Sequence, residues 1–329
     1  MSAHVPLDPQ LAAIVAAIGA RGEPPPFEGS APESRERMRR AVRSARERTP
    51  PIAVGGTEDA LAVDGPLQVP VRVYRPPTAS ALLPTVVFFH GGGFVLGSVE
   101  TADDIARKLC AQVNAVVVSV EYRLAPEHPY PAAHDDALAA TRWALGNAQA
   151  LGGDAARVAV AGESAGANLA ASTALRLRDE GVRLAAQLLV VPGVDVARDT
   201  SALPTDTPLL TAADLRAISR LLMGGRPELA AGFPPSPLRA PSLAGSPPAV
   251  IALAGHDPLQ GEGEAYARRL QADGVPVDLM RFPDMFHPFF GFFAASAAAC
   301  RAHDLICRAF RARLHSPLPL PSQPPKETP

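Results

Sequence analysis

The sequence contains little cysteine and little excess charge. Its 329 residues include only three cysteines, Cys110, Cys300 and Cys307, too few for a disulfide-built scaffold in a chain of this length. We therefore expect reduced thiols. The formal net charge of -2 argues against binding to nucleic acid or to anionic membranes. No Cys-x-x-Cys pair suggests zinc, and we expect neither a metal nor an organic cofactor.

Long hydrophobic runs and a positively charged leader are also lacking. No apolar run reaches the roughly 18 residues that a membrane-spanning helix needs. The stretch Leu11–Ala20 is apolar, but Asp8 precedes it and no Lys or Arg does, which argues against a secretory signal. These features predict a cytoplasmic protein without stable membrane insertion.

Residues 1–55 are expected to form an N-terminal helical cap segment. Apolar side chains recur at helical spacing near residues 8–20 and again near 33–48. The second stretch contains seven arginines, but glutamates lie among them. This mixture favours a solvated helix face over a basic patch for a membrane or nucleic acid.

From residue 56 onward, short apolar runs alternate with helical patterns. We expect strands near residues 57–63, 69–75, 85–89, 115–120, 158–161, 187–191, 249–254 and 277–282. Helices are expected near 102–113, 131–150, 165–180, 262–273 and 294–314. Continuous apolar strands separated by helices predict an α/β fold with a mostly parallel central sheet flanked by helices.

One long segment breaks this alternation. Almost sixty residues separate the strands near 187–191 and 249–254, too many for a simple loop. We expect a cap insertion at about 197–235, paired with the N-terminal helices. Residues 56–315 would then form the catalytic domain, and the Pro-rich residues 316–329 a disordered tail.

The motif Gly162-Glu163-Ser164-Ala165-Gly166 lies between a predicted strand and a predicted helix. A sharp strand-to-helix turn exposes a serine oxygen and points the following N–H groups at a developing oxyanion. The alternative is an ordinary serine at a glycine-rich turn, which the strand–turn–helix context disfavours. We therefore predict a serine hydrolase with Ser164 as its nucleophile.

The run His90-Gly91-Gly92-Gly93-Phe94 directly follows the strand near 85–89. The N–H groups of Gly92 and Gly93, joined by that of Ala165, are candidates for an oxyanion hole. A phosphate-binding loop would need a Lys-Ser/Thr pair after the glycines, and none follows. His90 is expected to brace this loop.

The base and the acid should follow the nucleophile in the order serine, acid, histidine. His287 comes just after the last predicted strand, whereas His303 falls within a helix. Asp257 ends the strand near 249–254 and is the preferred acid, since neighbouring His256 is too close to it to be its partner. Asp195 also ends a strand and remains a competitor.

These motifs, in this order, resemble the hormone-sensitive lipase family of α/β-hydrolases, the bacterial carboxylesterases in particular. Tyr122–Glu127, Ser236–Leu238, Asp257–Leu259 and Phe286-His287 extend the likeness over roughly residues 60–315. The resemblance implies an α/β-hydrolase fold with a helical cap. It also implies a Ser164–Asp257–His287 triad with Gly92, Gly93 and Ala165 as oxyanion donors.

The resemblance further implies a carboxylic ester hydrolase that acts on small-molecule, short- to medium-chain acyl esters through an acyl-enzyme. Phe94 and the run that begins at Phe289 are candidates for the substrate-binding wall, although a phenylalanine cluster is more often core. Alternatives are an amidase or deacetylase with the same triad, and a non-catalytic receptor on the same fold. Relatives often pair through a sheet edge, so a homodimer is a possible assembly. Ala167, Gln260-Gly261 and Pro288 depart from the family pattern without removing a triad group.

Overall fold

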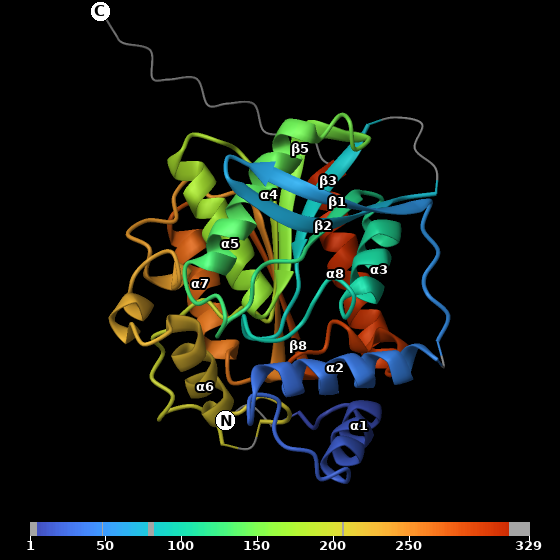
Figure 1. Ribbon diagram of the computed structural model, residues 1–329, viewed down its shortest axis with the longest axis vertical. Helices are drawn as coiled ribbons and strands as arrows, with labels where there is room; N and C mark the ends of the chain where they lie inside the picture. Colours follow the sequence, from blue (N-terminus) through green and yellow to red (C-terminus); the bar gives the residue numbers. More distant parts are fainter. Residues whose placement is uncertain (1–4, 48, 78–81, 206, 316–329) are drawn as a thin grey trace, which may run out of the picture.

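The computed structural model describes residues 5–47, 49–77, 82–205 and 207–315, so the expected tail at 316–329 lies outside the described residues. Its centre is one eight-stranded sheet with the strand order β1-β2-β4-β3-β5-β6-β7-β8 (Figure 1). Pairing is antiparallel at β1–β2 and β2–β4 and parallel elsewhere. The strands are β1 (Gly56–Asp64), β2 (Leu67–Arg75), β3 (Leu83–Phe89), β4 (Val116–Val120), β5 (Gly153–Glu163), β6 (Gln187–Val190), β7 (Ala249–His256) and β8 (Val277–Phe286).

Helices cover both faces of this sheet (Figure 1). One face carries α4 (Ala132–Asn147), α5 (Ala165–Asp179) and α7 (Gln260–Ala272), and the other carries α3 (Asp103–Val113) and α8 (Ala297–His315). Alternate residues of β3 enter the two resulting cores, because successive side chains of a strand point to opposite faces. The structure thus confirms the mostly parallel sheet with helices on either side.

The ends of some elements differ from the expected ones. β5 begins at Gly153, several residues before the apolar run near 158–161. Its first residues are mostly polar or small and partly exposed, so the hydrophobic pattern does not reveal them. β8 continues through Pro283 to Phe286, although proline normally weakens a strand assignment. β8 is an edge strand, where a missing N–H is tolerated.

Three helices lie beyond one end of the sheet, where α5 begins (Figure 1). They are α1 (Pro9–Gly19), α2 (Ala31–Arg46) and α6 (Ala212–Met223), and α6 is followed by short 3-10 turns at Pro227–Ala231 and Pro237–Arg239. Capping boxes start α2 at Ser30 and α6 at Thr211. Within the described ranges, no helix is long and apolar enough to cross a membrane.

Arg35 attaches the first turns of α2 to loops that follow two central strands. Its Nε donates to the carbonyl of Val95 at 2.7 Å, and its Nη2 donates to the carbonyl of Ala125 at 2.8 Å. The same guanidinium forms an ion pair with Glu127 at 2.7 Å. Planar guanidinium suits this arrangement because it presents several N–H donors in a fixed fork.

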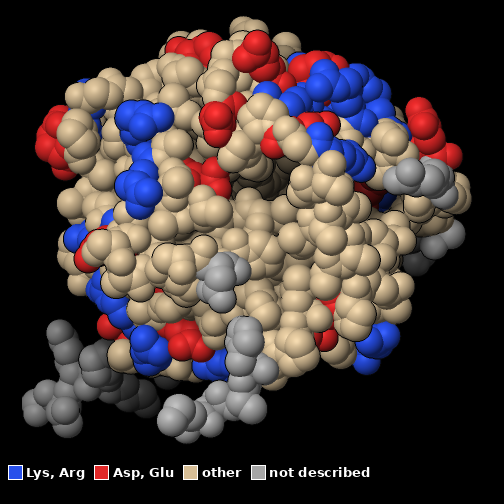
Figure 2. Space-filling model, turned by 90° about the horizontal axis from the view of Figure 1, so that it is seen from below, with Lys and Arg blue, Asp and Glu red and all other residues tan. Residues whose placement is uncertain are grey.

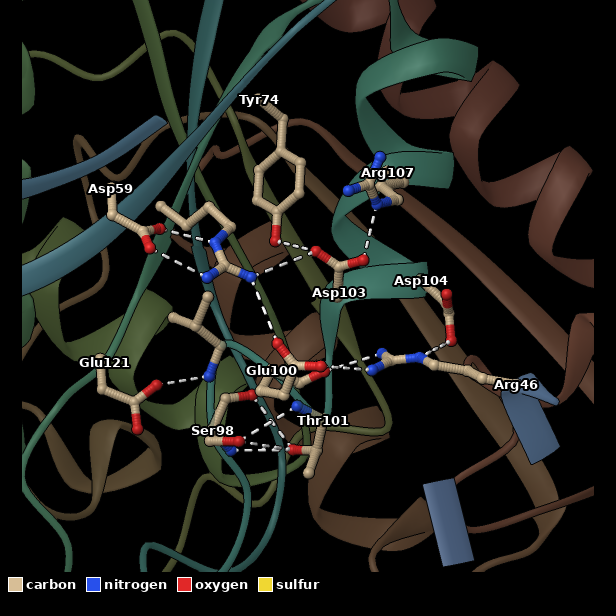
Figure 3. Close-up of polar contacts among 12 residues, drawn as sticks. Arg46, Asp59, Tyr74, Ser98, Glu100, Thr101, Asp103, Asp104, Arg107 and Glu121 are labelled. Carbon is tan, nitrogen blue, oxygen red and sulfur yellow. Dashed lines mark hydrogen bonds and ion pairs between the residues drawn. The ribbon is translucent and has the colours of Figure 1, made fainter. Parts of the chain in front are cut away.

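A second charged cluster holds the other end of α2 (Figure 3). Arg46 forms ion pairs with Asp104 at 2.8 Å and with Glu100 at 3.0 Å. Glu100 also forms an ion pair with Arg72 of β2. Arg72 lies 3.7 Å from Asp103, and Asp103 accepts a hydrogen bond from the hydroxyl of Tyr74 at 2.7 Å. The long helix α2 is therefore fixed at both ends to segments that follow β3 and, through Arg35, also to the segment that follows β4.

We expect Arg35→Met to lower the free energy of unfolding by about 2 kcal/mol, because carbonyls and a carboxylate lose a charged donor while the apolar stem remains. Urea denaturation followed by circular dichroism measures this change. Arg40→Met, at an exposed position of the same helix, is the matched control and should stay within about 0.5 kcal/mol of the parent. Equal effects of the two substitutions would show that the Arg35 contacts contribute nothing specific.

Candidate active site

Ser164 occupies a tight turn between β5 and α5. Its φ is 57°, a left-handed value that is strained for a residue with a side chain. Its N–H donates to the carbonyl of Val190 at 2.9 Å, which fixes the turn to the neighbouring strand. A Cβ atom on Gly162 would lie 2.2 Å from the backbone of Gly166, and one on Gly166 would lie 2.0 Å from the carbonyl oxygen of Phe89. Glycine is therefore required at both positions.

The structure brings Ser164, His287 and Asp257 into one hydrogen-bonded series. His287 Nε2 lies 2.8 Å from Ser164 Oγ, and His287 Nδ1 lies 3.0 Å from Asp257 Oδ2. The other carboxylate oxygen of Asp257 accepts the N–H of Leu259 at 2.8 Å. Because a carboxylate only accepts, Nδ1 carries the proton and Nε2 can accept the hydroxyl proton. Both His287 and Asp257 are 4% exposed, so this relay is shielded from water.

The glycine loop after β3 presents free N–H groups to the same cavity. Gly92 and Gly93 have φ values of 120° and 61°, and within the described residues neither amide donates to a backbone carbonyl. The carbonyl of Gly92 instead accepts the N–H groups of Val95 and Leu96 at 3.1 and 2.8 Å, which closes the loop. Ala165 is the first residue of α5, where N–H groups have no partner within the helix.

His90 lies beneath this loop. Its Nδ1 is 2.8 Å from the carbonyl oxygen of Gly91, and its ring stacks on Tyr122 with centroids 4.2 Å apart. The hydroxyl of Tyr122 donates to the carbonyl of His90 at 2.7 Å. Burial lowers the pKa of His90 to about 4, so its imidazole is neutral at ordinary pH. These contacts make His90 a brace for the glycine loop.

The competing acids and bases have other partners. Asp195 forms an ion pair with Arg239, with Nε–Oδ1 and Nη2–Oδ2 distances of 2.8 and 2.9 Å. His256 Nε2 lies 3.0 Å from the carbonyl oxygen of Val5. His303 is buried against Phe290, with ring centroids 4.1 Å apart. Only His287 among these histidines contacts the hydroxyl of Ser164.

A cavity of about 500 Å³ opens beside Ser164 and His287. Seen from below, the face that carries α1, α2 and α6 is hollowed, and uncharged residues dominate its centre (Figure 2). Phe94 lies in the wall, as expected. Many of the other apolar wall residues come from the N-terminal segment, from α6 and from the chain after His287, among them Ile18, Phe27, Met38, Leu215, Ile218 and Phe292. Such a volume and lining suit a small, largely apolar ligand.

Phe289 does not line this cavity. It is fully buried and packs against Phe282, with ring centroids 5.4 Å apart. The expected wall position belongs instead to Phe292, in the short 3-10 helix Phe292–Ala294. The chain is irregular after His287, so no periodic pattern indicates which phenylalanine faces the ligand.

Two further residues at the nucleophile turn had no signal in the sequence. Asn168, one turn into α5, donates from Nδ2 to the carbonyls of Gly193 and Pro235 at 2.7 and 2.9 Å. It thereby ties the nucleophile helix to the segment after β6. Glu163, at the variable position of the pentapeptide motif, has a carboxyl group in the cavity wall. Burial raises the pKa of this carboxyl to about 7, against the opposing attraction of His287.

Comparisons with known proteins agree with this geometry. A family model described as the alpha/beta hydrolase fold matches residues 86–291. Esterase LipI of Mycobacterium tuberculosis is 43% identical, covering 78% of this chain and 82% of its own. Carboxylesterase NlhH of the same species is 42% identical, covering 79% and 83% respectively. The solved structure of a hyperthermophilic esterase from the archaeon Pyrobaculum calidifontis superposes with a TM-score of 0.88 at 35% identity, covering 94% of this chain and 99% of its own.

Replacement of the two candidate acids should separate them. We expect Asp257→Asn to lower kcat for a p-nitrophenyl ester by about 10⁴-fold, because an amide at this position favours the wrong imidazole tautomer. Asp195→Asn should lower kcat by less than about tenfold, since its carboxylate faces Arg239. Thermal melting of both variants checks that each is folded. A larger loss from Asp195→Asn would transfer the role of the acid to that residue.

Proposed function

Because this chain belongs to the hormone-sensitive lipase family of α/β hydrolases and hydrolyses carboxylic esters, we propose that Ser164, His287 and Asp257 perform that hydrolysis through an acyl-enzyme. The observation that carries the proposal is the continuous hydrogen-bonded series from Asp257 through His287 to Ser164. It ends beside a glycine loop with free amides and opens into a largely apolar cavity.

The proposed reaction has two balanced halves. Ser164 Oγ attacks the ester carbonyl carbon while His287 Nε2 takes the hydroxyl proton, and the amides of Gly92, Gly93 and Ala165 stabilise the oxyanion. The tetrahedral intermediate then expels the alcohol, which leaves with the proton from His287. Water repeats the attack with His287 as base, and the carboxylic acid departs as the serine is restored. Asp257 stabilises the imidazolium in both halves.

We also propose that residues 1–55 and about 197–235 act together as a cap over the domain formed by residues 56–315. Side chains from both segments line the cavity, among them Ile18, Phe27 and Met38 from the first and Leu209, Leu215 and Ile218 from the second. A volume of about 500 Å³ shared between the acyl and alcohol parts of a substrate favours short- to medium-chain esters.

We expect Ser164→Ala to lower kcat by about 10⁴-fold or more, leaving only the contribution of binding and the oxyanion hole. The measurement uses p-nitrophenyl butyrate, with mass spectrometry of the protein after treatment with a reactive phosphonate. The parent should gain one adduct on Ser164 and the variant none. An unaffected rate would contradict the proposed mechanism.

A comparison of p-nitrophenyl esters with the matching acyl anilides completes this test. Esters should turn over while the anilides do not, or do so far more slowly. Turnover of anilides without esters would support an amidase instead. Binding without any turnover would support a receptor.

The wall of the cavity that α2 forms should influence the preference of the enzyme for acyl-chain length. Met38→Trp adds bulk to this wall, so we expect kcat/KM for p-nitrophenyl octanoate to fall at least about tenfold relative to the acetate. Met38→Leu preserves volume and should retain the parental ratio. If the tryptophan variant lowers both substrates equally, the acyl chain does not lie along this wall.

A further inference from the structure

Glu163 immediately precedes the nucleophile, and its carboxyl group connects two loops of the site. Oε1 accepts the N–H of Phe290 at 3.2 Å, three residues after the histidine of the relay. Oε2 lies against the glycine loop, because a Cβ atom on Gly91 would be 3.5 Å from it. The side chain is 5% exposed and reaches the cavity wall. One buried acid thus touches both the loop that carries His287 and the loop that carries the oxyanion donors.

The attraction of His287 lowers the pKa of this carboxyl, against the effect of burial, and so favours the ionised acid. The other ionisable groups nearby are neutral or paired. His90, beneath the glycine loop, is kept neutral by burial, and burial also lowers the pKa of His303 behind Phe290. Arg198, in the same cavity wall, forms a 2.7 Å ion pair with Glu262. A negative charge on Glu163 therefore acts mainly on His287.

We propose that Glu163 is a positioning residue for His287, whose carboxylate holds the 287–290 loop and stabilises the imidazolium formed during catalysis. This inference rests on the proposed function, since the imidazolium appears only if His287 takes the proton of Ser164. Asp257 orients the ring through Nδ1, and Glu163 adds a second negative charge in a site shielded from water. A buried negative charge stabilises the imidazolium more than an exposed one would, because the low dielectric constant of the site strengthens the attraction between the two charges.

Burial of the ionised carboxyl of Glu163 lowers the free energy of unfolding, a cost that is expected where a group serves activity rather than folding. Burial raises its pKa from 4.5 to about 7. Between these values the folded protein binds more protons than the unfolded chain, so stability falls as pH rises from about 4.5 to about 7. Above pH 7 the cost remains in full, and removing the carboxylate should then stabilise the fold.

Glu163→Gln tests the proposal because glutamine keeps the size and the acceptor for Phe290 but loses the charge. At pH 8.5 we expect kcat to fall about tenfold, the equivalent of one pKa unit of imidazolium stabilisation. The melting temperature at pH 8.5 should rise, while at pH 4.5 it should match the parent. The acid limb of the pH dependence of kcat/KM should lose the component near pH 7 that the parent owes to the carboxyl of Glu163.

Two controls sharpen this experiment. Glu121→Gln removes another largely buried acid that accepts a backbone N–H, from Val99, and it lies outside the cavity wall. This variant should keep the parental kcat and acid limb. Glu163→Asp keeps the charge and should retain a carboxyl component in the acid limb, with kcat closer to the parent than that of Glu163→Gln.

Several outcomes would overturn the inference. Loss of both activity and melting temperature in Glu163→Gln at pH 8.5, with the acid limb unchanged, would show a purely structural role. Failure of that variant to fold, or equal behaviour of the aspartate and glutamine variants, would show that charge is not what matters. If Ser164→Ala is inactive while Glu163→Gln matches the parent, only this inference fails. Retained activity in Ser164→Ala would instead remove the proposed function itself.

Discussion

The close approach of α5 to the end of β3 is the constraint on which the site depends. Gly166 lies so near the carbonyl oxygen of Phe89 that any side chain there would collide with it. This contact places the amino end of α5 beside the glycine loop that continues β3. The hydroxyl of Ser164, the first N–H of the helix and the amides of Gly92 and Gly93 therefore meet in one small volume.

The proposed cap is connected to this centre through α2. α2 contributes Met38 to the cavity wall, and Arg35 of the same helix binds the carbonyl of Val95, just after the glycine loop. Val95 in turn donates its N–H to the carbonyl of Gly92, which closes the glycine loop. The N-terminal segment thus both lines the cavity and supports the glycine loop, which is the proposed oxyanion site. The charged contacts at both ends of α2 hold the helix in place, so that Met38 stays in the cavity wall while Arg35 stays bound to Val95.

The sequence predicts the sheet, and it leads to Ser164 and His287 as the proposed nucleophile and base, because each follows from local pattern and chain order. Choosing between Asp257 and Asp195 is harder, since both end a strand. The structure separates them by distant partners: Asp195 pairs with Arg239, 44 positions away, and no local pattern reports such a pairing. For a related reason, the sequence does not indicate that Phe292 rather than Phe289 lines the cavity. In an irregular loop, side-chain direction depends on tertiary packing, here against Phe282.

Departures from ordinary folding rules concentrate where the chemistry is proposed. Ser164 has a strained left-handed backbone, and Glu163 beside it buries a carboxyl group whose pKa burial raises to about 7. The sheet around them obeys the rules, with β3 and β4 fully buried between two layers of helices. Strain and buried charge persist only where the surrounding packing holds them in place. The rigid α/β core can therefore be understood as the support that lets two adjacent residues adopt states that neither would adopt alone.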